Sequence, residues 1–323
     1  MDFPVTRTRS FGFRLALLLA VELLVPARPA TSQAREGYAV TDDSVRLWYR
    51  VVGAGNETVL VPVGLFFGTR LDGLASGRRI VLYDPRGRGR SDSVAPAKVS
   101  LDNQIRDAET IRRAVGAERV ALIGWSGLGM EMFVYALRHP NRVTRLVQLA
   151  PVPPRAAPYM ERMMADRRSR TDSVDWNALQ AQKARGEFDA DEAAWCRELK
   201  RVTTPASFGD ISFAAQAPDV CAFRNEWPSR LSPYFEALLG SLGEFDWRSE
   251  LSRVRIPRLI IHGERDNISL TGNREWAAGQ PQARLLVIPG AGHWPHYERA
   301  KQTLSAIETF LDGRWPEGSE QVR

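Results

Sequence analysis

The stretch that decides the fold reads Ile123-Gly124-Trp125-Ser126-Gly127-Leu128-Gly129. It continues the apolar run Val120 to Ile123, which is typical of a buried strand, and precedes a helical pattern over Met130 to Arg138. A serine at the tip of a tight strand-to-helix turn holds its hydroxyl clear of the backbone, and small neighbours make room for the strained turn. The helix that follows directs its N-terminal amides toward the same place. The stretch therefore predicts a strand–turn–helix unit with Ser126 as a nucleophile.

Seven further apolar runs of strand length surround this unit, which makes eight with the run Val120 to Ile123. The first two are split by the turn residues 42–44 and predict a hairpin. The later runs are apolar without clean alternation and alternate with helical patterns, which is typical of a parallel sheet covered by helices on both faces. The sequence therefore predicts an α/β fold with a mostly parallel, eight-stranded sheet. The expected strands are 38–40, 45–51, 58–62, 79–83, 120–123, 145–149, 258–261 and 284–288, and the expected helices outside the insertion are 101–115, 130–138, 273–278 and 297–311.

The alternation of strands and helices stops between residues 151 and 250. This stretch holds only short helical patterns, at 159–167, 176–185, 191–201 and 231–242. We expect a helical cap inserted into the sheet domain. The chain then divides into a signal peptide (1–34), a first part of the core (35–150), the cap (151–250) and a second part of the core (251–323).

The N-terminal segment has the pattern of a signal peptide. Three arginines precede a short apolar run from Leu15 to Val25, Pro26 follows, and Ser32-Gln33-Ala34 offers small residues for cleavage. The apolar run is too short to span a bilayer, and no other segment approaches the required length. We therefore expect an exported protein, periplasmic or secreted, without a membrane span in its mature form.

The formal net charge of the 323 residues is +6, but the arginines are spread along the chain and mixed with acids. A nucleic-acid surface would gather them in one stripe with stacking aromatics, so we expect no nucleic-acid partner. The two cysteines, Cys196 and Cys221, leave two interpretations open. Export permits a disulfide between them, and two small buried residues are the alternative.

A serine nucleophile needs a base, and the chain has four histidines. His293 follows the last expected strand in the loop Pro289-Gly290-Ala291-Gly292-His293-Trp294, at the carboxyl edge of the sheet where open α/β folds bind ligands. His139 ends the helix after Ser126, and His262 lies at the end of a buried strand. His296 is the alternative base, expected beside the site.

The imidazole in turn needs an acceptor on its other nitrogen. The segment Ile261-His262-Gly263-Glu264-Arg265-Asp266 closes a strand with two carboxylates, and the residues alone leave Glu264 and Asp266 both open.

These three segments resemble the nucleophile elbow, the histidine loop and the acid loop of the α/β-hydrolase superfamily. The resemblance runs from about Gly37 to the end of the chain and is loosest in the cap. It implies a catalytic triad of Ser126, Asp266 and His293, with Glu264 in reserve, and a mechanism that needs no metal or organic cofactor. One departure is Leu128, where the family has glycine two places after the serine.

The loop Val63-Gly64-Leu65-Phe66 stands where the family has His-Gly before an oxyanion donor. The resemblance implies that the backbone N–H groups of Leu65 and Gly127 form the oxyanion hole, with Phe66 as an alternative to Leu65. For the substrate pocket we consider a set of mostly apolar residues, although plain core packing is the favoured explanation for the methionines. The set is Phe66, Trp125, Met130, Met160, Met163 and Glu226.

These features predict a serine hydrolase that cleaves a carboxylic ester of a small, partly apolar substrate through an acyl-enzyme. An aminopeptidase similar to proline iminopeptidases is the alternative, with Glu226 holding the α-ammonium group of the substrate. A ligand-binding protein without catalysis on the same fold is a more remote one.

Overall fold

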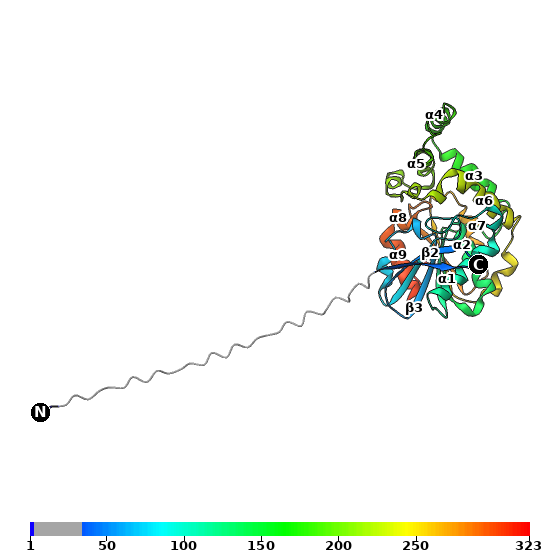
Figure 1. Ribbon diagram of the computed structural model, residues 1–323. Helices are drawn as coiled ribbons and strands as arrows, with labels where there is room; N and C mark the ends of the chain where they lie inside the picture. The colour runs from blue at the N-terminus through cyan, green and yellow to red at the C-terminus, as the bar shows by residue number, and fades with distance from the viewer. Residues whose placement is uncertain (3–33) are drawn as a thin grey trace. The chain divides into compact units, whose positions relative to one another are not determined.

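One sheet of eight strands forms the centre of residues 34–323, which the computed structural model describes together with residues 1–2 (Figure 1). The strand order is β1-β2-β4-β3-β5-β6-β7-β8; β1–β2 and β2–β4 pair antiparallel, and all later pairs are parallel. The predicted fold class is thereby confirmed. The strands are β1 (Arg35–Val40), β2 (Arg46–Val52), β3 (Glu57–Pro62), β4 (Arg78–Tyr83), β5 (Val120–Trp125), β6 (Val143–Leu149), β7 (Arg258–Gly263) and β8 (Ala283–Ile288).

Helices cover both faces of the sheet. Along β3, Leu60 joins one apolar cluster and Val59 and Val61 join another, because successive side chains of a strand point to opposite faces. The first cluster contains residues of α1 and α2, and the second contains residues of α9, so the strands are apolar throughout as the sequence indicated. These helices are α1 (Leu101–Ala114), α2 (Gly127–Arg138), α7 (Leu270–Arg274), α8 (Pro295–Glu298) and α9 (Ala300–Leu311).

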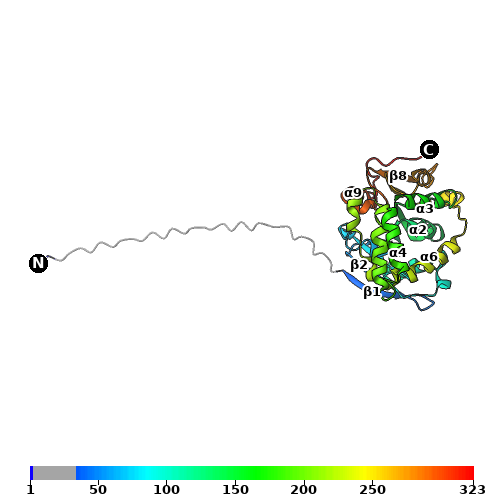
Figure 2. The ribbon, with the colours of Figure 1, turned by 90° about the horizontal axis from the view of Figure 1, so that it is seen from above.

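The segment between β6 and β7, here called the cap, contains helices and short 3-10 turns. Figure 1 shows α3, α4 and α5 above the strands, with α4 farthest from them, and Figure 2 shows α3, α4 and α6 from above. The cap is joined to the core at α6, where Gln104 Nε2 of α1 donates to Tyr234 Oη at 2.8 Å. Its helices are α3 (Tyr159–Arg170), α4 (Ser173–Ala184), α5 (Glu192–Thr203) and α6 (Pro228–Leu242).

Helices α2, α4 and α6 begin three residues before their expected starts, and two expected helices nearer the C-terminus differ further. The helix expected over 273–278 is α7, which begins earlier because Ser269 caps it by accepting from Gly272 N. The helix expected over 297–311 is broken into α8 and α9 at Arg299, whose φ of −134° and ψ of 49° are not helical. None of the helices that the structure describes is long and apolar enough to cross a bilayer. The expected signal peptide falls almost entirely on residues 3–33, outside the described residues.

Cys196 of α5 and Cys221 form a disulfide, with their Cα atoms 5.7 Å apart. The sequence left two interpretations of these cysteines open, and the structure contains the disulfide. Both cysteines are buried, and they pack in one apolar cluster with Val63 and Leu65 of the loop after β3. The disulfide thus joins two parts of the cap directly over a loop of the core.

We expect removal of the disulfide to destabilise the protein. The bridge links two residues that are 25 positions apart in the sequence. In the chain-entropy treatment, losing this restraint on the unfolded chain lowers the free energy of unfolding by about 3.5 kcal/mol. The double variant Cys196→Ala/Cys221→Ala should therefore have a lower unfolding free energy, measured by denaturant titration. Mass mapping without reductant should find the two cysteine peptides linked; two free thiols in protein kept under oxidising conditions would contradict the bridge.

Candidate active site

Ser126 lies between β5 and α2, at the carboxyl edge of the sheet. Its backbone has φ 58° and ψ −131°, a conformation that residues with a Cβ rarely adopt and that costs on the order of 1–3 kcal/mol. The Ser126 N–H donates to Leu149 O at 2.9 Å, and Ser126 O accepts from Gly129 N at 2.9 Å. Hydrogen bonds on both sides of the residue therefore hold the strained turn in place.

Two glycines leave the space that this turn needs. A Cβ on Gly124 would lie 2.3 Å from Leu128 O, and a Cβ on Gly129 would lie 2.9 Å from the Cβ of Pro151. A Cβ on Gly127 would meet nothing within 4 Å. The Leu128 side chain packs toward the apolar cluster around the disulfide, so the cap accommodates the side chain at the position noted above as a departure from the family pattern.

Two further side chains from separate loops meet Ser126. His293, in the loop after β8, has its Nε2 3.0 Å from Ser126 Oγ. Its Nδ1 lies 3.2 Å from both carboxylate oxygens of Asp266, in the loop after β7. The Asp266 side chain is fully buried, and that of His293 is 12% exposed. A carboxylate beside Nδ1 retains the ring proton there, which leaves Nε2 free to accept the hydroxyl proton of Ser126.

The competing carboxylate, Glu264, lies elsewhere. Its Oε2 accepts from Gly290 N at 2.8 Å, so it supports the loop that carries His293 and does not contact the ring. Asp266 is itself fixed by the N–H of Ile268, which donates to Oδ1 at 2.9 Å. The structure thus brings together the three residues that the sequence selected and leaves the reserve acid outside.

The backbone at His293 is hydrogen-bonded to the cap and to the end of β5. His293 N donates to Ser207 O at 2.8 Å, and the indole of Trp294 donates to Ser207 Oγ at 2.8 Å. The indole N–H of Trp125 donates to His293 O at 2.8 Å. Trp125 is buried and supports the histidine loop. The sequence analysis placed it in an open substrate pocket, and the structure does not.

Glu298 is a residue of this site that sequence reasoning missed. Its buried carboxylate accepts from Gly209 N at 2.8 Å, Asp210 N at 2.9 Å and Gly292 N at 2.8 Å. Burial raises the pKa of Glu298, and these N–H donors oppose the rise. One carboxylate thereby ties a cap loop to the residue before His293. An acid five residues after the histidine was the available signal, but two of its three partners, Gly209 and Asp210, lie 89 and 88 residues away in the sequence.

The other histidines do not reach Ser126. His262 Nδ1 lies 2.9 Å from Asn273 Nδ2, and burial lowers the pKa of His262. His296 is buried beside the ring of Trp125 and that of Trp294, and burial holds its pKa well below the usual value. His139 follows the last residue of α2. His262 and His296 are therefore neutral packing residues at neutral pH.

The expected oxyanion donors differ in their availability. Gly127 N–H, in the first turn of α2, has no acceptor among residues 34–323. Leu65 N–H donates instead to the buried Asp84 Oδ1 at 3.2 Å, and Phe66 N–H donates to Val63 O at 3.1 Å. Burial raises the pKa of Asp84 to about 6. Contrary to the sequence expectation, Leu65 is not a free donor in this conformation, because a carboxylate of the core already binds its amide.

Glu226 is not available to a substrate ammonium group, which corrects the sequence expectation. It is 1% exposed, and its two oxygens accept from Arg88 Nε and Nη2 at 2.8 Å each. Gly89 N donates to it as well, at 2.9 Å. The Arg88 guanidinium and this N–H hold the pKa of Glu226 below its usual value against the effect of burial. The carboxylate is thus ionised and fully engaged with the core.

The remaining pocket candidates separate by burial. Met130 is 2% exposed and packs in the core. It therefore does not line a cavity, although the sequence analysis counted it among the pocket candidates. Met160 and Met163 are half-buried on α3 and pack against the same apolar cluster. Phe66 is half-buried, with its ring centroid 5.1 Å from that of Trp125. Phe66 and the two α3 methionines therefore remain the apolar candidates between cap and core.

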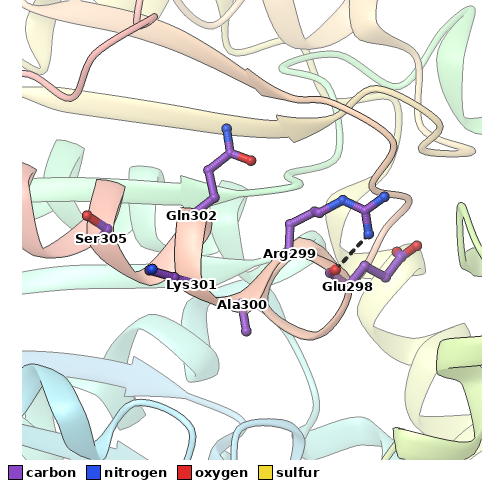
Figure 3. Close-up of a pocket in the computed structure, with 6 residues that line it drawn as sticks. All are labelled: Glu298, Arg299, Ala300, Lys301, Gln302 and Ser305. Carbon is purple, nitrogen blue, oxygen red and sulfur yellow. Dashed lines mark hydrogen bonds between the residues drawn. The ribbon is translucent and has the colours of Figure 1, made fainter.

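A surface hollow of about 540 Å³ lies along the start of α9 (Figure 3). Ser126, Asp266 and His293 do not line it, so it is separate from the site described above. The hollow is lined by Glu298, Arg299, Ala300, Lys301, Gln302 and Ser305.

Within the described part of the chain, no group of three or more His, Cys, Asp or Glu side chains is arranged to hold a metal ion.

A family model described as alpha/beta hydrolase fold matches residues 63–300, a range that includes Ser126, Asp266 and His293. The chain belongs to the alpha/beta hydrolase fold family. It is similar to the 2-hydroxy-6-oxononadienedioate/2-hydroxy-6-oxononatrienedioate hydrolase of Paraburkholderia phymatum, with 24% identity over 288 residues that cover 83% of this chain and 91% of the relative.

A second relative is serine hydrolase BPHL of Homo sapiens, with 25% identity over 315 residues that cover 92% of this chain and 96% of the relative. Among solved structures, the chain is similar to a malate-bound thermophilic esterase from Thermogutta terrifontis. The TM-score is 0.64 at 19% identity, over 86% of this chain and 98% of that one. This last likeness shows the shared fold.

The two carboxylates of the acid loop give a matched test of the site. Asp266→Asn keeps the size of the side chain but removes the charge that would stabilise a protonated His293, so hydrolase turnover should fall by roughly four orders of magnitude. Glu264→Gln can still accept from Gly290 N and should cost about tenfold or less, since a hydrogen bond of this kind contributes about 0.5–1.5 kcal/mol. A larger loss for Glu264→Gln, with both variants folded by circular dichroism, would show that the acid is misassigned.

Proposed function

We propose that this protein is a serine hydrolase that cleaves a carboxylic ester of a small, partly apolar substrate through an acyl-enzyme. The observation that carries the proposal is the 3.0 Å contact between Ser126 Oγ and His293 Nε2, with Asp266 3.2 Å from the opposite nitrogen. Membership of a hydrolase family and similarity to proteins named as hydrolases support the reaction class.

In the first step, His293 Nε2 takes the hydroxyl proton as Ser126 Oγ bonds to the ester carbonyl carbon. The carbonyl oxygen becomes an oxyanion, and the free N–H of Gly127 at the N-terminus of α2 is placed to donate to it. Asp266 stabilises the imidazolium that has formed. The carbon–oxygen bond to the alcohol then breaks, and His293 returns its proton to the departing alcohol.

The second step repeats this sequence with water. His293 removes a proton from a water molecule as its oxygen bonds to the acyl carbon of Ser126. Collapse of the second oxyanion breaks the bond to Ser126 Oγ, which takes the proton back from His293. The carboxylic acid is released, and the enzyme returns to its starting state.

The alternatives have less support. An aminopeptidase needs a carboxylate in the cap for the substrate ammonium group, and Glu226 is already bound by Arg88 and Gly89 N. A binding protein without catalysis has no need of a strained Ser126 aligned with a histidine and a buried aspartate. Both considerations favour ester hydrolysis. Half-buried Met160 and Met163 support an apolar portion in the substrate.

We also propose that the protein is exported after cleavage of residues 1–34. The proposal rests on the signal-peptide pattern of the sequence. The Cys196–Cys221 disulfide supports it, because disulfides form and persist in oxidising compartments such as the periplasm or the extracellular space.

A panel of p-nitrophenyl esters and aminoacyl p-nitroanilides tests the proposed reaction on residues 35–323. We expect release of p-nitrophenol from the esters at a rate that Ser126→Ala abolishes, and no release of nitroaniline, because the cap offers no free carboxylate at Glu226. Turnover of nitroanilides that requires a free α-amine would establish the aminopeptidase instead. Equal rates for the native protein and Ser126→Ala would refute hydrolysis at this serine.

A further inference from the structure

The carboxylate of Glu298 lies where the cap meets the loop that carries His293. The side chain is buried, and Figure 3 shows it extending away from α9. Its Oε2 accepts from Gly209 N at 2.8 Å and from Asp210 N at 2.9 Å, both in the cap, and its Oε1 accepts from Gly292 N at 2.8 Å. Backbone N–H groups from two distant parts of the chain therefore share one carboxylate.

The same two loops also touch through their backbones. A Cβ on Gly209 would lie 2.7 Å from Gly292 N, and a Cβ on Gly292 would lie 2.3 Å from Gly209 N. Both distances are shorter than those at which non-bonded heavy atoms pack, so neither position has room for a side chain unless the loops separate. Beside them, the rings of Phe208 and Trp294 stack with their centroids 5.4 Å apart. The cap and the histidine loop are thus in direct contact one residue before His293.

This contact bears on the base itself. His293 N donates to Ser207 O of the cap at 2.8 Å, and the amide one residue earlier is the one that Glu298 binds. The ring has to meet a partner on each side, with Nε2 3.0 Å from Ser126 Oγ and Nδ1 3.2 Å from the carboxylate of Asp266. A displacement of about 1 Å in such an arrangement can slow a reaction about 100-fold.

We propose that Glu298 and Gly209 are positioning residues, through which the cap holds His293 at the distance from Ser126 that proton transfer requires. Neither touches the reacting atoms. Glu298 acts through the N–H of Gly292, and Gly209 acts by letting the cap backbone approach that N–H closely. The inference rests on the proposed reaction and goes beyond it, because it makes the placement of the base depend on the inserted cap.

The first test is Glu298→Gln, which keeps the size of the side chain. A carboxylate accepts on both oxygens, whereas an amide has one oxygen and an NH2 group. The amide oxygen satisfies more donors when it faces Gly209 and Asp210, and the NH2 group then meets the N–H of Gly292 donor against donor. We expect kcat for the ester that is cleaved fastest to fall about tenfold to 100-fold, with KM changed less than about threefold.

Glu275→Gln is the matched control for this variant. Glu275 follows α7 in the core and also joins core to cap, because it accepts from Arg155 Nη2 at 2.7 Å and from the hydroxyl of Tyr159. Its cap partners lie at the start of the cap and not in the loop beside His293. We expect Glu275→Gln to retain kcat within about twofold at a temperature at which circular dichroism shows both variants folded.

The second test changes the cap alone. Gly209 has no positive φ, so alanine is excluded there by lack of space, and Gly209→Ala should push the loops apart at Gly292. We expect kcat to fall about tenfold or more. Gly240→Ala is the control within the same cap, because a Cβ on Gly240 would meet nothing within 4 Å, and it should retain kcat within about twofold.

Removal of the base separates positioning from a general loss of structure. The rate at which a fluorophosphonate labels Ser126 is measured in the native protein, in Glu298→Gln, in His293→Ala and in the double variant. We expect Glu298→Gln to slow labelling about tenfold or more when His293 is present, and less than about twofold when it is absent. Equal factors in the two backgrounds would overturn the inference, because Glu298 would then support the fold and not the base.

A readout without reaction separates this inference from the proposed function. Nitrogen-15 magnetic resonance of histidine-labelled protein reports the hydrogen bonds of the His293 ring, which is assigned by its absence in His293→Ala. We expect its ring signals to shift in Glu298→Gln and Gly209→Ala and to stay in place in Glu275→Gln. If no ester is cleaved and no serine is labelled but the signals respond in this way, the proposed reaction fails and the positioning stands. If Glu298→Gln and Gly209→Ala cleave esters at the native rate, the positioning fails alone.

Discussion

The strained backbone of Ser126, with its positive φ, is the constraint on which the rest of the site depends. Its cost is met by hydrogen bonds to Leu149 O and from Gly129 N, and by the absence of a side chain at Gly124, where a Cβ would lie 2.3 Å from Leu128 O. The conformation places the hydroxyl beyond the end of β5. At that position only loops from the carboxyl edge of the sheet can reach it, which is why acid and base follow β7 and β8.

The cap takes part in holding the base in place. Ser207 of the cap accepts from the His293 N–H, and Glu298 binds the N–H groups of Gly209 in the cap and of Gly292 beside the histidine. Movement of the cap loop would therefore move His293.

The sequence predicted what depends on local pattern. The eight strands follow from runs of apolar residues, and the positions of Ser126 and His293 follow from short segments that end strands. The choice of Asp266 over Glu264 came from the resemblance to the α/β-hydrolase superfamily. What the sequence analysis missed depends on partners far apart in the chain: Glu226 with Arg88, 138 residues away, and Glu298 with Gly209, 89 residues away. The engagement of Leu65 N–H by Asp84 is of the same kind, because nothing in the loop itself shows that a buried carboxylate lies against it.

The account depends most on Ser126 being a nucleophile activated by His293. The most direct measurement is the mass of the protein after treatment with a fluorophosphonate, followed by mapping of the modified peptide. We expect a single adduct on the peptide that contains Ser126, its absence in Ser126→Ala, and a much slower reaction in His293→Ala. An adduct on another serine, or unchanged labelling of Ser126→Ala, would contradict the account.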